Sequence, residues 1–141
     1  LHMCMRYRVC GMKTLILFLS FTWGIVATLL SFAVLGVCKI LGYRIRRRDG
    51  IFVVVSDKPN WGAFSFGVVC VMSSTSGKDT MYHEMGHCVQ NAMYGVFVFF
   101  LVYIPSIVRA AYRNWKGIKF GYYDIWFEKQ ASYLGNRIYG K

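Results

Sequence analysis

The chain has 141 residues, of which 56% are hydrophobic and only 16% are charged, and it carries a net charge of +11. Ordinary globular chains are about a quarter charged, and a core of this size cannot hide so much apolar surface from water. We therefore expect lipid or a partner protein to cover the apolar surplus. The basic residues flank apolar segments rather than one polar helix face, which favours anionic lipid over nucleic acid as the partner.

The cysteines give no support for a disulfide framework or a cysteine-based zinc site. They are odd in number, and they contain no CxxC pair and no regular spacing. We interpret them as small hydrophobic residues that are mostly buried. They are Cys4, Cys10, Cys38, Cys70 and Cys88.

The N-terminal part divides into a leader, an apolar span and a basic linker. Residues 1–13 are interpreted as a leader ahead of a natural start near Met12, and no function is assigned to them. Residues 14–38 contain no charged side chain, and roughly 20 apolar residues suffice to cross a bilayer. A cleaved signal peptide is the alternative, but the apolar run is too long and no A-x-A-like site follows it. We therefore expect an uncleaved transmembrane helix.

A basic juxtamembrane linker is expected over residues 39–50, where Lys39 and four arginines follow the span. The more positive flank of a span tends to stay in the cytoplasm. This predicts a membrane protein with a single crossing whose domain, residues 51–141, lies on the cytoplasmic face.

The domain is expected to open with short strands. Residues 51–55 are a β-branched run that ends in a turn-forming cluster. Residues 61–73 predict a second strand, or two strands broken near Gly67. A helix is then expected to begin at Asp79 or Thr80, both of which are good N-caps.

Two further helical segments are expected. The helix that begins at Asp79 or Thr80 runs into an uncharged stretch. We expect residues 95–108 of this stretch to dip into the membrane or to lie along it, because basic clusters stand on both sides of the stretch. The alternative is a core helix of a small domain. A last helix, capped by Asp124, should reach about Gly135 or Asn136. The predicted fold class is α+β, with the transmembrane helix, a short sheet and these helices.

The chemistry is predicted by one motif, His83-Glu84-Met85-Gly86-His87. On a helix, residues four apart face the same way, so both histidines can bind one metal ion. Glu84 stands one position round the helix, where its carboxylate reaches the metal-bound water and can act as a general base. This pattern indicates a hydrolytic zinc site.

A third protein ligand is needed, with a fourth position left for water. The only other histidine is His2, in the leader, so an acidic ligand is required. Downstream of the motif the candidates are Asp124 and Glu128. Glu128 is favoured because it lies within the last helix, which can present one face rigidly, whereas Asp124 stands where a helix cap is expected.

The chain resembles the gluzincin peptidases, in which HExxH is followed on a later helix by E-x-x-A-[DN]-x-x-[AG]. This arrangement occurs in membrane-embedded zinc peptidases of the prenyl-protease and heat-shock types and in small phage- or plasmid-linked proteases. The second motif reads Glu128-Lys129-Gln130-Ala131-Ser132-Tyr133-Leu134-Gly135. The resemblance covers roughly residues 61–135. It implies one zinc ion held by His83, His87 and Glu128, with Glu84 as the general base.

The resemblance also carries one departure and two open points. Ser132 stands where the family often has Asp or Asn, a residue that orients a ligand histidine. The segment Phe64 to Val71 is placed to be an edge strand that pairs with an extended substrate, although an ordinary core strand fits equally well. An oxyanion-stabilising donor is expected, and the tyrosines nearest the third-ligand helix are Tyr122, Tyr123 and Tyr133.

Three functions are consistent with these patterns. The favoured one is zinc-dependent hydrolysis of a peptide or protein substrate at or near the membrane. The alternative is a non-catalytic zinc-binding membrane protein that acts by interaction, but such a protein has no need of Glu84 beside its ligands. A cationic membrane-active protein leaves both Glu84 and Glu128 unexplained. The patterns do not indicate an oligomeric state.

Overall fold

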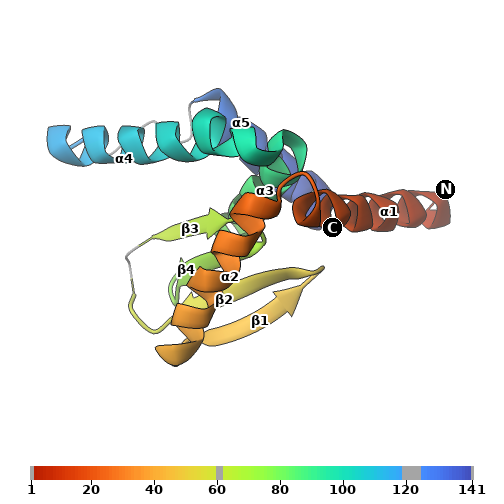
Figure 1. Cartoon of the computed structure of the whole chain (residues 1–141), viewed down its shortest axis with the longest axis horizontal. Helices are drawn as coiled ribbons and strands as arrows, with labels where there is room; N and C mark the ends of the chain where they lie inside the picture. The colour runs from red at the N-terminus through yellow and green to blue at the C-terminus, as the bar shows by residue number, and fades with distance from the viewer. Residues whose placement is uncertain (1, 60–61, 119–124, 141) are drawn as a thin grey trace.

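The computed structural model describes residues 2–59, 62–118 and 125–140. They form an α+β fold, as predicted, with one four-stranded sheet and helices on both of its faces (Figure 1). Helix α2 (Ile25–Ile40) packs on one face, where Cys38 meets Val54, Val69 and Val71. Helix α3 (Lys78–Tyr94) packs on the other face, so the sheet is the middle layer.

The sheet has the strand order β1-β2-β4-β3. Strand β2 (Ile51–Ser56) pairs in parallel with β4 (Val69–Ser73), and β3 (Ala63–Phe66) pairs antiparallel with β4. The predicted strand over residues 51–55 is confirmed, and so is the division of the following segment near Gly67. Trp61 lies outside the described residues. Strand β3 occupies one edge of the sheet.

The expected basic linker is instead largely a strand, β1 (Arg44–Arg48), which pairs antiparallel with β2. Asp49 and Gly50 connect the two strands with φ angles of 51° and 83°. Positive φ at both central residues is the geometry of a type I′ turn, for which Asp-Gly is a preferred pair. The charged composition of this segment concealed a hairpin whose turn residues are visible in the sequence.

The single helix expected over residues 14–38 is not observed, because the segment forms two helices. Helix α1 (His2–Phe21) includes most of the expected leader, and α2 begins after a break at Thr22–Gly24. The Thr28 hydroxyl donates a hydrogen bond to the Ser20 carbonyl at 2.6 Å across this break. These polar groups are buried and satisfied inside the bend, so the bend is part of the packing.

The N-terminal helix is tied to the sheet by an ion pair. Lys13, just before the expected span, pairs with Asp49, in the β1–β2 turn eleven residues beyond the span, at 3.0 Å. No described helix is by itself long and apolar enough to cross a membrane. Two pairs of helices are long and apolar enough when their lengths are combined, but each pair is strongly bent. The pair α1 and α2 is bent by 89°, and the pair formed by α3 and the helical segment that follows it is bent by 117°. The N-terminal membrane anchor stays a prediction.

Helix α3 ends at Gly95, whose φ of 58° continues no α-helix. A 3₁₀ turn η1 (Gly95–Phe97) and a π-helical segment η2 (Phe99–Tyr103) lead into α4 (Ile104–Lys116). The stretch expected to dip into the membrane is therefore an irregular bend followed by a regular helix. A side chain at Gly95 would collide with the Trp23 ring, 2.3 Å from the new Cβ, so the two breaks in the chain meet.

The last helix, α5 (Trp126–Tyr139), is longer than predicted and crosses α3 closely. A Cβ added at Gly86 would lie 1.8 Å from the Ala131 carbonyl oxygen, and one at Gly135 would lie 1.7 Å from that of Tyr82. The two backbones are therefore in direct contact at both glycines. This crossing determines where α5 lies relative to the motif helix.

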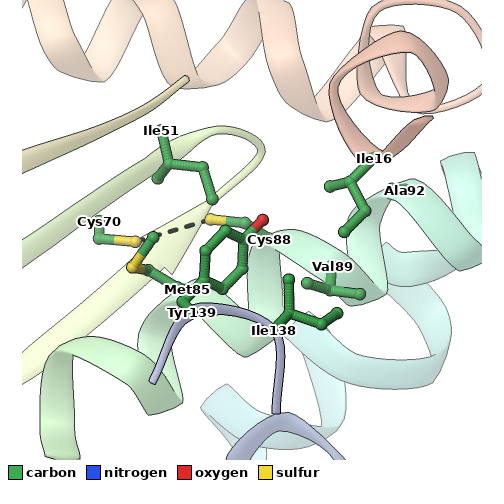
Figure 2. Packing of buried hydrophobic residues seen from close by; sticks show 9 residues of the cluster. All are labelled: Ile16, Ile51, Cys70, Met85, Cys88, Val89, Ala92, Ile138 and Tyr139. Carbon is green, nitrogen blue, oxygen red and sulfur yellow. Dashed lines mark hydrogen bonds between the residues drawn. The ribbon is translucent and has the colours of Figure 1, made fainter. Parts of the chain in front are cut away.

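A hydrophobic cluster joins α1, the sheet, α3 and α5 behind the motif (Figure 2). Met85 and Tyr139 are fully buried there, and the sulfur atoms of Cys70 and Cys88 lie 3.6 Å apart. Burial of a large apolar side chain contributes about 1.5–3 kcal/mol, so this cluster holds the motif helix against the sheet. Its members are Ile16, Ile51, Cys70, Met85, Cys88, Val89, Ala92, Ile138 and Tyr139.

The glycine contact makes a direct prediction for stability. We expect Gly135→Ala to lower the free energy of unfolding by about 1–3 kcal/mol, as overpacking does, because the opposing atom is backbone and cannot rotate away. Thermal unfolding of the detergent-solubilised protein measures the change.

Gly36→Ala is the matched control, because Gly36 lies inside α2 and an added Cβ there meets nothing within 4 Å. This substitution should leave stability unchanged or raise it by up to about 1 kcal/mol, through helix propensity. Equal unfolding temperatures for the two variants would contradict the close crossing of α3 and α5.

Candidate metal centre

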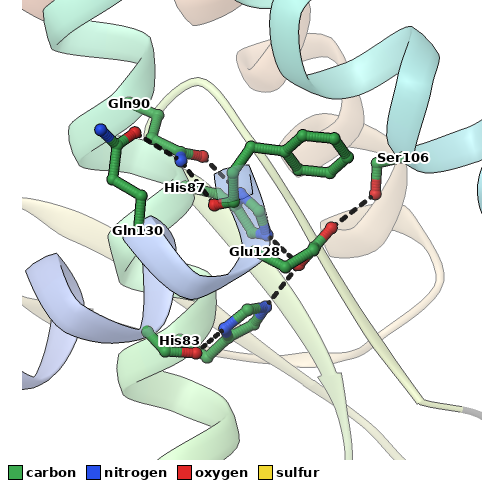
Figure 3. Close-up of polar contacts among 8 residues, drawn as sticks. His83, His87, Gln90, Ser106, Glu128 and Gln130 are labelled. Carbon is green, nitrogen blue, oxygen red and sulfur yellow. Dashed lines mark hydrogen bonds and ion pairs between the residues drawn. The ribbon is translucent and has the colours of Figure 1, made fainter. Parts of the chain in front are cut away.

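The motif histidines lie on one face of α3, and Glu128 faces them from the first turn of α5 (Figure 3). The glycine contacts described above bring the two helices close enough for these side chains to meet. The partial positive charge at a helix N-terminus favours a carboxylate in the first turn. His83, His87 and Glu128 are all buried, and Glu128 has no exposed surface at all.

One carboxylate oxygen of Glu128 is shared between the two histidines. Its Oε2 atom lies 3.0 Å from His83 Nε2 and 3.3 Å from His87 Nε2. One potential ligand atom from each residue lies within 4.8 Å of the other two. The three residues predicted as ligands are therefore brought together, and they form a buried group able to hold a metal ion.

The outer nitrogen of His87 is fixed by a glutamine. His87 Nδ1 lies 2.7 Å from Gln90 Oε1, while Gln90 Nε2 donates to the Phe127 carbonyl at 2.7 Å and to Gln130 Oε1 at 3.0 Å. Both groups that receive a hydrogen bond from Gln90 Nε2 are acceptors, so the orientation of the Gln90 amide is determined. Gln90 Oε1 can only accept, and His87 Nδ1 therefore carries the proton. In the neutral ring, the Nε2 lone pair then points at Glu128.

This arrangement places a nitrogen lone pair against a buried carboxylate, which requires a cation between them. A proton can meet the requirement, and so can a metal ion. Burial alone raises the pKa of Glu128, but hydrogen bonds from His83 and His87 outweigh burial and bring this pKa to about 2. Burial lowers the pKa of His87, and the facing Glu128 more than offsets it, so that this pKa is raised. Two imidazole nitrogens and one carboxylate oxygen are a donor set that zinc accepts.

The outer nitrogen of His83 lies 2.7 Å from the Ser132 hydroxyl. Ser132 thus occupies the place at which a histidine-orienting group is expected, although it is not the Asp or Asn that the resembling family often carries. A hydroxyl carries no charge, so it holds the ring with a weaker hydrogen bond than a carboxylate would.

The second carboxylate oxygen of Glu128 is bound by a residue that sequence analysis missed. The Ser106 hydroxyl, from the first turn of α4, donates to Glu128 Oε1 at 3.0 Å (Figure 3). Nothing in its sequence surroundings distinguishes Ser106, because it lies in an apolar stretch that predicts only a membrane segment or a core helix. The contact connects α4 directly to the metal centre.

The glutamine network was also missed, although a signal was present. Tyr94 donates its hydroxyl proton to Gln130 Oε1 at 2.7 Å, so Gln130 joins Tyr94 to Gln90. Gln90 and Asn91 are both fully buried. Two amides directly after the motif, on a helix that is otherwise apolar there, indicate buried polar partners.

A cavity of about 510 Å³ opens beside the centre. Strand β3 forms one wall, and the segment from Val102 to Ile107 forms another. Glu84, which is not part of the three-residue cluster, lines this cavity together with His83 and His87. The lining residues are Gly62 to Phe66, Ser76, Thr80, His83, Glu84, His87, Val102, Tyr103, Ser106 and Ile107. Glu84, the predicted general base, therefore shares one cavity with His83 and His87, two of the three predicted ligands.

The remaining candidates are not placed in this cavity. Asp124, Tyr122 and Tyr123 lie outside the described residues. Tyr133 is exposed, and its hydroxyl is bonded by Arg137 away from the cavity. Tyr103 lines the cavity, and its hydroxyl accepts a hydrogen bond from the Gly67 amide at 3.1 Å.

Comparison with known proteins found no matching family, no matching curated protein and no matching solved structure. The resemblance to gluzincins accordingly stays an expectation. The geometry of the cluster and its cavity carries the functional proposal.

The cluster predicts metal binding in a defined ratio. We expect about one zinc ion per chain in the purified protein, since three protein ligands and a water complete a tetrahedral site. His83→Ala and Glu128→Ala should each abolish it, as measured by elemental analysis. Asp57→Ala removes an exposed acidic side chain and serves as the control. Zinc retained in Glu128→Ala would exclude Glu128 as a ligand.

The glutamine network predicts a smaller effect. We expect Gln90→Leu to keep the zinc site but to weaken its affinity about 10- to 100-fold, as the loss of a ligand-orienting hydrogen bond does. Competition with a chromophoric chelator measures the affinity. Asn91→Leu is also a buried amide loss on the same helix, but Asn91 contacts Thr28 rather than the centre. Similar affinities for both variants would show a general packing effect instead.

Proposed function

We propose that the protein is a zinc-dependent peptidase that cleaves a peptide or protein substrate at or near a membrane. The observation that supports this most directly is the shared cavity. A buried group of two histidines and one carboxylate, suited to zinc, opens on the same cavity as a second, separate carboxylate. A site that only stores a metal ion has no use for Glu84 or for a cavity of this volume.

In this proposal His83, His87 and Glu128 hold the ion. A zinc ion bound there lowers the pKa of a coordinated water towards neutrality and polarises the scissile carbonyl. The Glu84 carboxylate accepts the proton of the attacking water and delivers it to the leaving amine. Ser106 and the two histidines fix both oxygens of Glu128, so that carboxylate stays a ligand and does not compete as the base.

The substrate in this proposal is an extended peptide. Strand β3 is paired with β4 on one side only, and it forms a wall of the cavity with its residues Ala63 to Phe66. An extended segment can add to such an edge through main-chain hydrogen bonds. The edge strand predicted between Phe64 and Val71 corresponds to β3, whereas β4 lies inside the sheet.

The decisive variant is Glu84→Gln, which removes the base but preserves the shape of the side chain. We expect zinc content to stay at the wild-type value while cleavage of a peptide library falls by about 10²- to 10⁴-fold, the usual contribution of a general base. Mass spectrometry of the library measures cleavage. Asp57→Asn makes the same acid-to-amide change at an exposed site and should cleave like wild type.

Two outcomes decide between hydrolysis and the alternative. Cleavage that survives in Glu84→Gln would overturn the proposed base. Zinc-loaded wild-type protein that cleaves nothing in the library, in detergent or on vesicles, would favour the non-catalytic zinc-binding membrane protein.

A further inference from the structure

A continuous row of exposed apolar side chains runs along η1, η2 and α4. We call it the apolar stripe. Single residues or adjacent pairs recur along it at three- or four-residue intervals, which is the spacing of one helix face. Their exposed fractions range from 40% for Val96 to 78% for Trp115. They are Val96, Phe97, Phe100, Leu101, Ile104, Ile107, Val108, Tyr112 and Trp115.

Helix α4 separates this stripe sharply from its polar residues. At about 100° per residue, Ser106, Arg109 and Arg113 fall on the side opposite Ile104. Ser106 contacts the metal centre, so the stripe faces away from the domain. No residue of α4, all of which is described, is buried. The helix projects from the body of the molecule, opposite in direction to α1 (Figure 1).

The stripe continues onto the N-terminal helix pair. Trp23, at the break between α1 and α2, packs on Phe97 with ring centroids 6.1 Å apart. Both rings are about half exposed. The two bends of the chain therefore meet in one exposed aromatic patch, from which the stripe leads outwards along α4.

The charges around the stripe suit an anionic bilayer. Arg109, Arg113 and Lys116 stand on the polar side of α4, and the whole chain carries a net charge of +11. A helix with basic residues on one face and large apolar residues on the other typically lies in the membrane plane, with its apolar face about 5–10 Å deep. The large aromatic residues at the ends of the stripe are typical of the membrane–water interface.

The N-terminal segment is packed against the domain at both ends. Lys13, at its near end, forms an ion pair with Asp49 of the β1–β2 turn at 3.0 Å, and Cys38, at its far end, packs against Val54, Val69 and Val71 of the sheet. Ile16, inside the predicted span, belongs to the same hydrophobic cluster as Ile51 and Met85. Both ends of the segment are therefore held against the domain.

We propose that the described residues bind one face of a membrane: the apolar stripe and the Trp23–Phe97 patch seat them on one leaflet of an anionic phospholipid bilayer, which residues 14–38 do not cross. Ile107 belongs to the stripe and also lines the cavity, so the mouth of the cavity lies at the lipid surface. Resting on the proposed peptidase function, this assigns as substrates peptide segments that lie on or emerge from the same leaflet.

Vesicle flotation tests the seating. Wild-type protein should float with vesicles of phosphatidylcholine and phosphatidylglycerol and bind at least tenfold more weakly to phosphatidylcholine alone. Val108→Asp, in the stripe, should weaken binding to the anionic vesicles at least tenfold. Asn114→Asp adds the same charge at an exposed position on the margin of the stripe, and it should weaken binding by no more than about fivefold, the effect of one charge near the surface.

Three results would overturn the proposal. The first is unchanged vesicle binding by Val108→Asp. The second is a change in oligomeric state, by light scattering, in place of a change in vesicle binding, which would assign the stripe to a second copy of the chain. The third concerns sidedness. In intact bacterial spheroplasts, an impermeant thiol reagent should label Cys10, in a Cys4→Ser background, and Lys58→Cys, in a Cys4→Ser and Cys10→Ser background, alike, and labelling of only one would show a crossing.

Wild-type protein from which a chelator has removed zinc separates this proposal from the peptidase proposal and keeps the Ser106–Glu128 contact of α4 in place. It should bind anionic vesicles as well as the zinc-loaded protein does, because the stripe does not depend on the metal. Loss of cleavage with intact vesicle binding therefore bears only on the peptidase, and loss of vesicle binding with intact zinc content bears only on the membrane seating.

Discussion

The crossing of α3 and α5 at Gly86 and Gly135 is the constraint on which the rest of the structure depends. Any side chain at either glycine would occupy the space of the opposite backbone. Only at this separation can Glu128 share one oxygen between His83 and His87. The hydrophobic cluster around Met85 holds α3 against the sheet, so the glycine contact also sets the place of α5 relative to the sheet and the cavity.

Each ligand is restrained by a partner from a different part of the chain. Gln90 holds His87 from the same helix, Ser132 holds His83 from α5, and Ser106 holds Glu128 from α4. A candidate metal centre restrained in this way keeps its geometry with or without an ion, because neither ring nor carboxylate can rotate without losing a hydrogen bond. The restraint also joins the exposed helix α4 to the most deeply buried of the described carboxylates, that of Glu128.

Most of the candidate metal centre could be predicted from the sequence, but less of the architecture could. His83, Glu84 and His87 follow from helical spacing, and Glu128 follows because few acidic residues are available. The shape of the N-terminal segment could not be predicted in the same way, since an apolar run fits both a membrane span and a bent, packed hairpin. Ser106 could not be found, because its role depends on a fold that brings α4 to α5. The β1–β2 hairpin was overlooked although Asp49-Gly50 signals it.

The π-helical segment η2 has a consequence for how this chain can vary. A π turn contains about one residue more than an α turn, and each residue rotates whatever follows by about 100°. Deleting a single residue between Phe99 and Tyr103 would therefore turn α4 about its own axis by more than a quarter of a revolution. Ser106 would then leave Glu128, and the apolar stripe would rotate with it. The number of residues in η2 therefore determines how α4 is rotated about its own axis. We expect relatives that keep both the stripe and the serine to keep the length of η2 as well.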